Sequence, residues 1–317
     1  MINFLRKTFY YLVSLSAIIF VVIKTFELFV GIESNFRLDK NVKYIVLGHS
    51  HPECAFNDSV IKNFKNLSQS GESYYYTYFK AREILKHNPS IETVFIEFTN
   101  NQIDESMNNW IWEEKYMNYR YPIYSPFISL SDKMVLAKNN FSGYMNALSL
   151  SLKYNLNKLI NRDFNYSEII GGYQCLGISK VDSLIMNDRN SIVNSHDNKI
   201  SDVNLSYLEK TIEYCKNKGK NVFIIRSPQH KKYQGYSNED FYQKIIRDRF
   251  KTVKYLDFAF FSLRNKEYAD LEHLNYMGGK IFSIWFNEIL AMDILNKYDS
   301  QELITREIQQ RNDTLFR

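Results

Sequence analysis

The sequence contains few of the residues that mark several common protein classes. Its three cysteines include no C-x-x-C pair, so neither a disulfide framework nor a cysteine-based zinc site is expected. Only 11 glycines and 5 prolines occur in 317 residues, which argues against low complexity and long disorder. The formal charge of +5 comes without a dense Lys/Arg run, so no nucleic-acid partner is expected. The remaining composition, 45% hydrophobic and 16% aromatic, is sufficient for a full core.

The N-terminus carries an uncharged apolar run, Thr8–Ile23, preceded by Arg6 and Lys7. These sixteen residues span about 24 Å as a helix, less than the ~30 Å hydrocarbon core, but the aliphatic stem of Lys24 extends the span. No small-x-small site follows, so residues 1–35 are predicted to be an uncleaved single-pass anchor. A cleaved signal peptide and an interfacial helix are the alternatives. The basic flank favours a cytoplasmic N-terminus and an extracytoplasmic domain.

Residues 36–317 alternate short apolar runs with longer helical patterns. This alternation predicts an α/β fold, specifically a three-layer α/β/α sandwich around a parallel central sheet. Residues from about 104 to 203 do not continue this alternation of strand and helix patterns and are predicted to be an insertion in a single domain. The expected strands cover residues 44–47, 66–68, 93–96, 222–225 and 253–256, and the expected helices cover 72–87, 205–218, 239–250 and 276–295.

Polar residues follow the first three expected strands, at 48–51, 68–71 and 99–102. Parallel sheets carry their functional groups at the carboxyl ends of strands, so these residues are expected to surround a site. Ser50 follows a buried strand and a glycine, which exposes its hydroxyl at the sheet edge. Asp270 and His273 lie three residues apart, so a carboxylate could orient an imidazole base.

These motifs resemble a known family. Gly48-His49-Ser50 after a strand, and Asp270-Leu271-Glu272-His273-Leu274-Asn275 near the end, resemble the first and last blocks of the SGNH (GDSL-like) hydrolase superfamily. The resemblance spans roughly residues 43–290 and implies a flavodoxin-like fold. It also implies Ser50 as nucleophile, His273 as base and Asp270 as the orienting acid.

The two middle blocks of the family have weaker counterparts that would form the oxyanion hole. The resemblance implies a backbone N–H from Ser50, another from Gly71 in Ser-Gln-Ser-Gly, and a side-chain amide from Asn100, with Asn101 as the fallback. The sequence departs from the family at two positions. His49 stands where an Asp precedes the serine, and Phe98 replaces the glycine of the third block.

The N-terminal anchor narrows the resemblance. With Gly-x-Ser-His and Asn-Leu-Ser-x-Ser-Gly, the chain is similar to SGNH-type proteins of bacterial cell-envelope and exopolysaccharide O-acylation. That similarity implies acyl-ester hydrolysis or O-acetyl transfer on an acylated carbohydrate, beside a membrane-bound acyltransferase partner and without a cofactor. The 24 tyrosines and 23 phenylalanines suit sugar stacking, but a hydrophobic core is the favoured explanation for them.

Two other interpretations stay open. The chain could be a non-catalytic, envelope-anchored glycan-binding or assembly protein with a degenerate SGNH fold. It could also be a metal-dependent hydrolase, because the His-x-His pair of His49 and His51, with Glu53, His273 and Asp270, offers metal-ligand chemistry. The serine interpretation needs no metal. His51 and Arg226 are then candidates to position the substrate.

Overall fold

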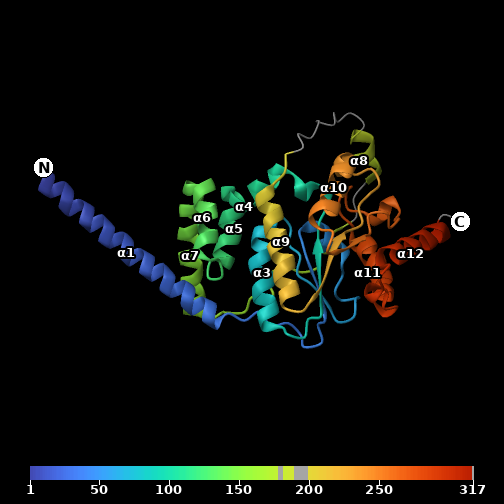
Figure 1. The fold of residues 1–317 in the computed structure, drawn as a ribbon, viewed down its shortest axis with the longest axis horizontal. Coiled ribbons are helices and arrows are strands. Elements are labelled where there is room, and N and C mark those ends of the chain that lie inside the picture. The colour runs from blue at the N-terminus through green and yellow to red at the C-terminus, as the bar shows by residue number, and fades with distance from the viewer. Residues whose placement is uncertain (178–180, 189–198, 316–317) are drawn as a thin grey trace. The chain divides into compact units, whose positions relative to one another are not determined.

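The computed structural model describes residues 1–177, 181–188 and 199–315, and the chain forms two compact units (Figure 1). The first unit combines Met1–Phe36 with Trp112–Tyr166, and the second combines Arg37–Ile111 with Ser167–Arg317. Much of the expected insertion at 104–203 therefore groups with the N-terminal helix. Residues 178–180 and 189–198 of that insertion lie outside the described residues.

The second unit is built on a five-stranded sheet in the order β2-β1-β3-β4-β5. Every neighbouring pair is parallel, which confirms the predicted α/β class and parallel pairing. The strands are β1 (Tyr44–Leu47), β2 (Phe64–Asn66), β3 (Thr93–Glu97), β4 (Asn221–Arg226) and β5 (Lys254–Asp257).

β2 ends two residues earlier than the sequence suggests. The side-chain oxygen of Asn66 accepts a hydrogen bond from the Ser68 N–H at 2.9 Å, which turns the chain away from the sheet. The amide nitrogen of Asn66 meanwhile donates to the backbone oxygens of Pro52 and Phe56, each at 2.8 Å. The hydrogen bonds of the Asn66 side chain to nearby backbone groups therefore take the place of strand pairing at residues 67–68.

Helices cover both faces of this sheet. The pair α3 and α9 packs together on one face, whereas α11 and α12 lie on the other (Figure 1). The α-helices of this unit are α2 (Ser50–Ala55), α3 (Tyr74–His87), α8 (Val181–Asp188), α9 (Asp202–Asn217), α10 (Glu239–Arg249), α11 (Tyr276–Ala291) and α12 (Ser300–Leu315), and α4 (Asn109–Trp112) crosses the boundary between the units. Single 3₁₀ turns are η1 (Asn100–Ile103), η2 (Glu105–Asn108), η3 (Gln234–Asn238), η4 (Asn265–Glu267) and η5 (Ile294–Asn296).

An aromatic core fixes the α11 face of the sheet. Phe95 of β3 stacks on Phe223 of β4 with ring centroids 5.5 Å apart, and Phe286 of α11 contacts Phe95 at 5.5 Å. Phe56, which follows α2, packs edge-on against Phe286 at 5.0 Å. Because α2 begins at Ser50, this core also fixes the backbone that carries the candidate nucleophile.

The first unit contains the long N-terminal helix α1 (Ile2–Glu33) with α5 (Glu114–Tyr124), α6 (Leu130–Asn139) and α7 (Phe141–Asn161). Within α1, an 18-residue window has a mean hydropathy of 2.2 and is mostly unburied, so by length and composition α1 could cross a membrane. The helix continues past Lys24. There Glu27 is buried and pairs with Lys24 at 2.8 Å and with Lys133 of α6, so these charges are balanced within the protein.

Candidate active site

The site begins where β1 ends, at a glycine that the packing requires. A Cβ atom on Gly48 would lie 2.7 Å from both Glu97 Cβ and Pro52 Cγ, which is too close for a side chain at this position. Only glycine therefore lets the chain pass between β3 and α2 at this point. The turn places Ser50 at the first position of α2, at the carboxyl edge of the sheet.

The structure brings together the three residues expected to form a triad. Ser50 Oγ lies 2.8 Å from His273 Nε2, and His273 Nδ1 lies 2.9 Å from Asp270 Oδ2. Asp270 Oδ1 also accepts hydrogen bonds from the backbone N–H groups of Glu272 at 2.7 Å and His273 at 2.8 Å. These contacts form one continuous chain of hydrogen bonds from a carboxylate to a serine hydroxyl.

Asp270, the carboxylate at the end of this hydrogen-bonded series, is held in its charged form. Burial by itself would raise the pKa of Asp270, but the hydrogen bond and charge of His273, with two backbone N–H donors, lower it below its usual value. An ionised Asp270 accepts the proton of His273 Nδ1. The opposite nitrogen, Nε2, is then left as the proton acceptor that faces Ser50.

A second ionisable cluster lies beside Ser50. His49 Nδ1 is 3.3 Å from Ser50 Oγ, and His49 Nε2 is 3.6 Å from Glu97 Oε2. His51 Nδ1 lies 3.3 Å from Glu97 Oε1, and His51 Nε2 lies 3.5 Å from Glu272 Oε2. The histidine pair was anticipated from the sequence, but Glu97 and Glu272 were not. The sequence signal that would have identified Glu97 is a charged residue directly after the apolar run of β3.

Burial and charge act in opposite directions on the two histidines. Burial lowers the pKa of His49 to about 4, because the attraction of Glu97 only partly offsets the loss of solvent. Burial also disfavours the charged form of His51, but Glu97 and Glu272 outweigh it and raise the pKa of His51 to about 9. The protonated form of His51 is therefore favoured beside the Glu97 carboxylate.

Gly71, the second expected oxyanion donor, has a backbone conformation that favours glycine. Its φ of 69° lies in the left-handed region, which favours glycine. Within the described part of the chain, no acceptor is found for the Gly71 N–H. Its proposed partnership with the Ser50 N–H remains a prediction.

Asn100 is buried in a different network. Its amide nitrogen donates to Glu239 Oε2 at 2.8 Å and to Asn238 Oδ1 at 3.1 Å, and its oxygen accepts from Arg226 Nη1 at 2.9 Å. Asn100 could therefore serve an oxyanion only by giving up one of these bonds. The side-chain oxygen of Asn101 accepts from Thr99 Oγ1 at 2.7 Å, and this bond does not use its amide nitrogen.

Arg226, a candidate for substrate positioning, is held by carboxylates. Its guanidinium makes two bonds to Asp257, at 3.0 and 2.5 Å, and a third to Glu239 at 2.6 Å. Although burial opposes the charge, these bonds raise the pKa of Arg226 further above its ordinary value. Since Arg226 is almost fully buried, its first role is to tie β4 to β5 and α10.

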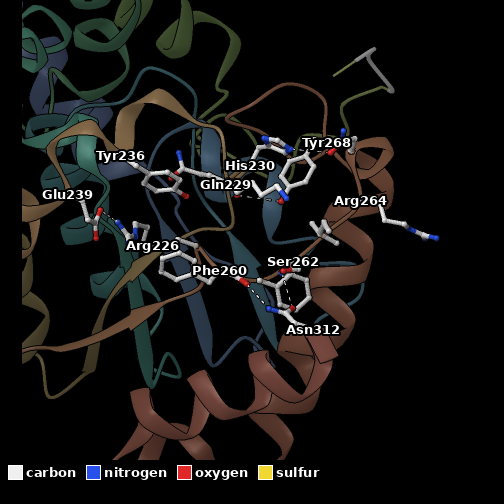
Figure 2. A pocket seen from close by; sticks show the side chains of 15 residues that line it. Arg226, Gln229, His230, Tyr236, Glu239, Phe260, Ser262, Arg264, Tyr268 and Asn312 are labelled. Atoms are coloured by element: carbon white, nitrogen blue, oxygen red, sulfur yellow. Dashed lines mark hydrogen bonds and ion pairs between the residues drawn. The ribbon is translucent and has the colours of Figure 1, made fainter. Parts of the chain in front are cut away.

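A cavity of about 650 Å³ lies beside this network (Figure 2). Rings of Tyr236, Phe260 and Tyr268 line it together with the charged side chains of Arg226 and Arg264. Gln229 belongs to the cavity wall, and its amide nitrogen lies 3.3 Å from the His51 ring. The loop after β4 therefore separates this cavity from the residues around Ser50.

The order of the strands also favours this edge as a ligand site. The order reverses between β1 and β3, and ligands of doubly wound sheets bind at such a switch point, outside the carboxyl ends of the strands. Ser50 follows β1 there, and Glu97 ends β3.

Comparison with known proteins adds one finding. A model of an uncharacterised protein family matches residues 177–295, which include Asp270 and His273 but not Ser50. No curated protein matches the chain.

Proposed function

We propose that this chain is a serine esterase or O-acyltransferase of the SGNH type. The observation that carries the proposal is the hydrogen-bonded series Ser50–His273–Asp270, with distances of 2.8 and 2.9 Å. These separations are those expected of a nucleophile, its base and the acid that orients the base. The reversal of strand order beside Ser50 supports an SGNH-like sandwich.

In the proposed reaction, Ser50 Oγ attacks an acyl carbonyl while His273 Nε2 accepts its proton. The carbonyl oxygen becomes an oxyanion, stabilised by the N–H groups of Ser50 and Gly71 and by the amide of Asn101 or Asn100. As the ester bond breaks, His273 returns the proton to the leaving oxygen and an acyl-Ser50 ester remains. Water or a sugar hydroxyl then attacks this ester, with His273 again as base. Water as acceptor gives hydrolysis, and a sugar hydroxyl gives transfer.

The proposed substrate is an acylated carbohydrate of the cell envelope or an exported polysaccharide. The cavity beside Arg226 combines aromatic faces with charged and amide side chains, a combination that suits the apolar faces and hydroxyls of sugar rings. Because the loop after β4 separates this cavity from Ser50, it would hold a sugar unit away from the reacting ester. In this proposal α1 anchors the chain in a single pass, with the catalytic unit outside the cytoplasm and beside a membrane-bound acyltransferase. Protease added to intact cells should then digest the sheet unit. Its protection until lysis would contradict the orientation.

Covalent labelling tests the proposed nucleophile. The full chain in detergent is treated with a fluorophosphonate probe, and p-nitrophenyl acetate turnover is measured in parallel. Wild type should be labelled on Ser50. Turnover by Ser50→Ala and His273→Ala should fall by roughly 10⁴–10⁶-fold, as expected when one member of a triad is removed. Ser106→Ala, which changes an exposed serine in η2, is the matched control.

Two results would decide against this proposal. Absence of labelling in wild type, under conditions that label a control hydrolase, would favour the non-catalytic glycan-binding alternative. Activity that is abolished by a chelator yet retained in Ser50→Ala would favour metal-dependent hydrolysis.

A further inference from the structure

Three buried side chains beside Ser50 form a cluster that the triad does not use. His49, His51 and Glu97 are 1%, 2% and 0% exposed. Neither carboxylate oxygen of Glu97 has a hydrogen bond of normal geometry within the described residues. Buried carboxylates are nearly always satisfied by donors or by a cation. The groups that face Glu97 are the His49 and His51 rings and the Ser227 side chain, so a cation held between the two rings is one way to balance its charge.

The spacing of the facing atoms matches a metal polyhedron. His51 Nδ1 lies 3.3 Å from Glu97 Oε1, and His49 Nε2 lies 3.6 Å from Glu97 Oε2. One ligand atom from each residue can be chosen so that all lie within 4.8 Å of one another. Bonds of about 2.0–2.1 Å to a tetrahedral zinc ion require ligand separations of about 3.4 Å. Adjacent ligands of an octahedral ion at similar bond lengths would lie about 3.0 Å apart, which fits less well.

The outward ring nitrogens have the partners that metal-bound histidines usually have. His51 Nε2 lies 3.5 Å from the Glu272 carboxylate, which can accept its proton and orient the ring. His49 Nδ1 faces Ser50 Oγ at 3.3 Å. The inward nitrogens, His49 Nε2 and His51 Nδ1, face the Glu97 carboxylate, and the Gln229 amide nitrogen lies 3.3 Å from both ring nitrogens of His51.

We propose that His49 Nε2, His51 Nδ1 and the Glu97 carboxylate bind one zinc ion. Two neutral imidazoles and a carboxylate are a donor set that Zn²⁺ commonly uses, and a water molecule is the fourth ligand. Thr99 Oγ1 lies 3.5 Å from His49 Nε2 and donates its proton to Asn101, so this oxygen is a nearby acceptor for that water.

The site has a consequence for the nucleophile. With Nε2 bound to zinc, His49 carries its proton on Nδ1 and donates it to Ser50 Oγ. Ser50 then accepts one hydrogen bond from His49 and donates its own proton to His273. Zinc here orients the serine hydroxyl and does not replace it as the nucleophile. Metal binding itself does not depend on the proposed esterase function.

Metal content of the purified full chain tests this site. Wild type, Glu97→Gln, His51→Gln and the matched control His87→Gln are incubated with ZnCl₂, dialysed and analysed by inductively coupled plasma mass spectrometry. His87 lies at the end of α3 and contacts Glu83, away from the cluster. We expect one zinc ion per chain in wild type and His87→Gln, and a loss of at least about tenfold in both ligand variants. A Co²⁺-substituted wild type should show the absorption bands of tetrahedral coordination.

Each outcome decides the proposal. Wild type without zinc above the dialysis blank would overturn it, whether or not the variants fold. Zinc retained at full stoichiometry by Glu97→Gln and His51→Gln would also overturn it, because the ion would then lie elsewhere. Circular dichroism shows whether a variant has unfolded. If a variant has unfolded, its zinc content is not used, and the Co²⁺ spectrum of wild type tests for the tetrahedral site instead. Fluorophosphonate labelling of Ser50 is scored separately, so the two proposals can fail independently.

Discussion

The hydrogen bonds of Asp270 predict a specific defect in Asp270→Asn. Oδ1 accepts the backbone N–H groups of Glu272 and His273 at 2.7 and 2.8 Å, and both carboxylate oxygens lie within 3.0 Å of His273 Nδ1. In the variant, the remaining carbonyl oxygen would stay on the two N–H groups, which turns the new amide nitrogen towards Nδ1. An amide nitrogen only donates, so the ring must accept at Nδ1 and carry its proton on Nε2.

A proton on Nε2 prevents His273 from acting as the base for Ser50. We expect kcat/KM for p-nitrophenyl acetate to fall by about 10³–10⁴-fold, the loss expected when a triad histidine adopts the wrong tautomer. This loss corresponds to about 4–5.5 kcal/mol in the activation barrier. The substitution preserves side-chain volume, so the fold should persist.

Steady-state kinetics of the full chain in detergent, from pH 6 to 9, measure the effect. Asp248→Asn alters an exposed carboxylate of α10 and provides the matched control. If Asp270→Asn retains a rate within tenfold of wild type at every pH, Asp270 does not select the tautomer, and the reasoning from its hydrogen bonds is wrong.

Three further changes test the packing and electrostatics around the site. Gly48→Ala puts a methyl group 2.7 Å from side-chain carbons of β3 and α2 and should cost about 1–3 kcal/mol in urea unfolding, whereas Gly172→Ala, which meets nothing within 4 Å, should be nearly neutral. Arg226→Met leaves the half-buried Asp257 without its cation and should lower the free energy of unfolding by about 3–5 kcal/mol. Arg226→Lys should not restore the two-bond contact. Equal unfolding midpoints for wild type and both variants would refute this. Because the folded-state pKa of Asp270 is lowered, its stabilising effect is present above its unfolded pKa of about 3.9 and disappears as pH falls through the folded value. The difference in Tm between wild type and Asp270→Asn at pH 7 should therefore close below about pH 4, and a constant difference down to pH 3 would contradict the assignment.

Local patterns in the sequence were sufficient for the parallel sheet and for the residues around Ser50. Buried parallel strands are short apolar runs, and their carboxyl ends share one edge, so the polar residues after β1 and β3 were expected to meet. Asp270 and His273 are only three residues apart, so their pairing needs little tertiary information. The Thr8–Ile23 run likewise predicted an apolar helix, which the structure extends to Ile2–Glu33.

Interactions between distant segments were decided by the tertiary structure. Glu97 faces His49 and His51 because β1 and β3 are neighbours in register, and no local pattern encodes that register. Asn100 was expected at the oxyanion from its position after β3, yet its amide binds Asn238 and Glu239 at the start of α10.

The sequence alone thus determined the strands and helices of the α/β part and the local pairs, because helical and strand periodicities and short spacings are properties of consecutive residues. The helices α5, α6 and α7 within the expected insertion were not predicted. Which buried charges face one another depends on how strands and helices far apart in the chain pack, and only the folded chain decides it. The Asp270–His273 pair was therefore expected from its spacing and the Ser50–His273 pair from the resemblance to the SGNH superfamily, whereas the cluster of His49, His51 and Glu97 emerged from the structure.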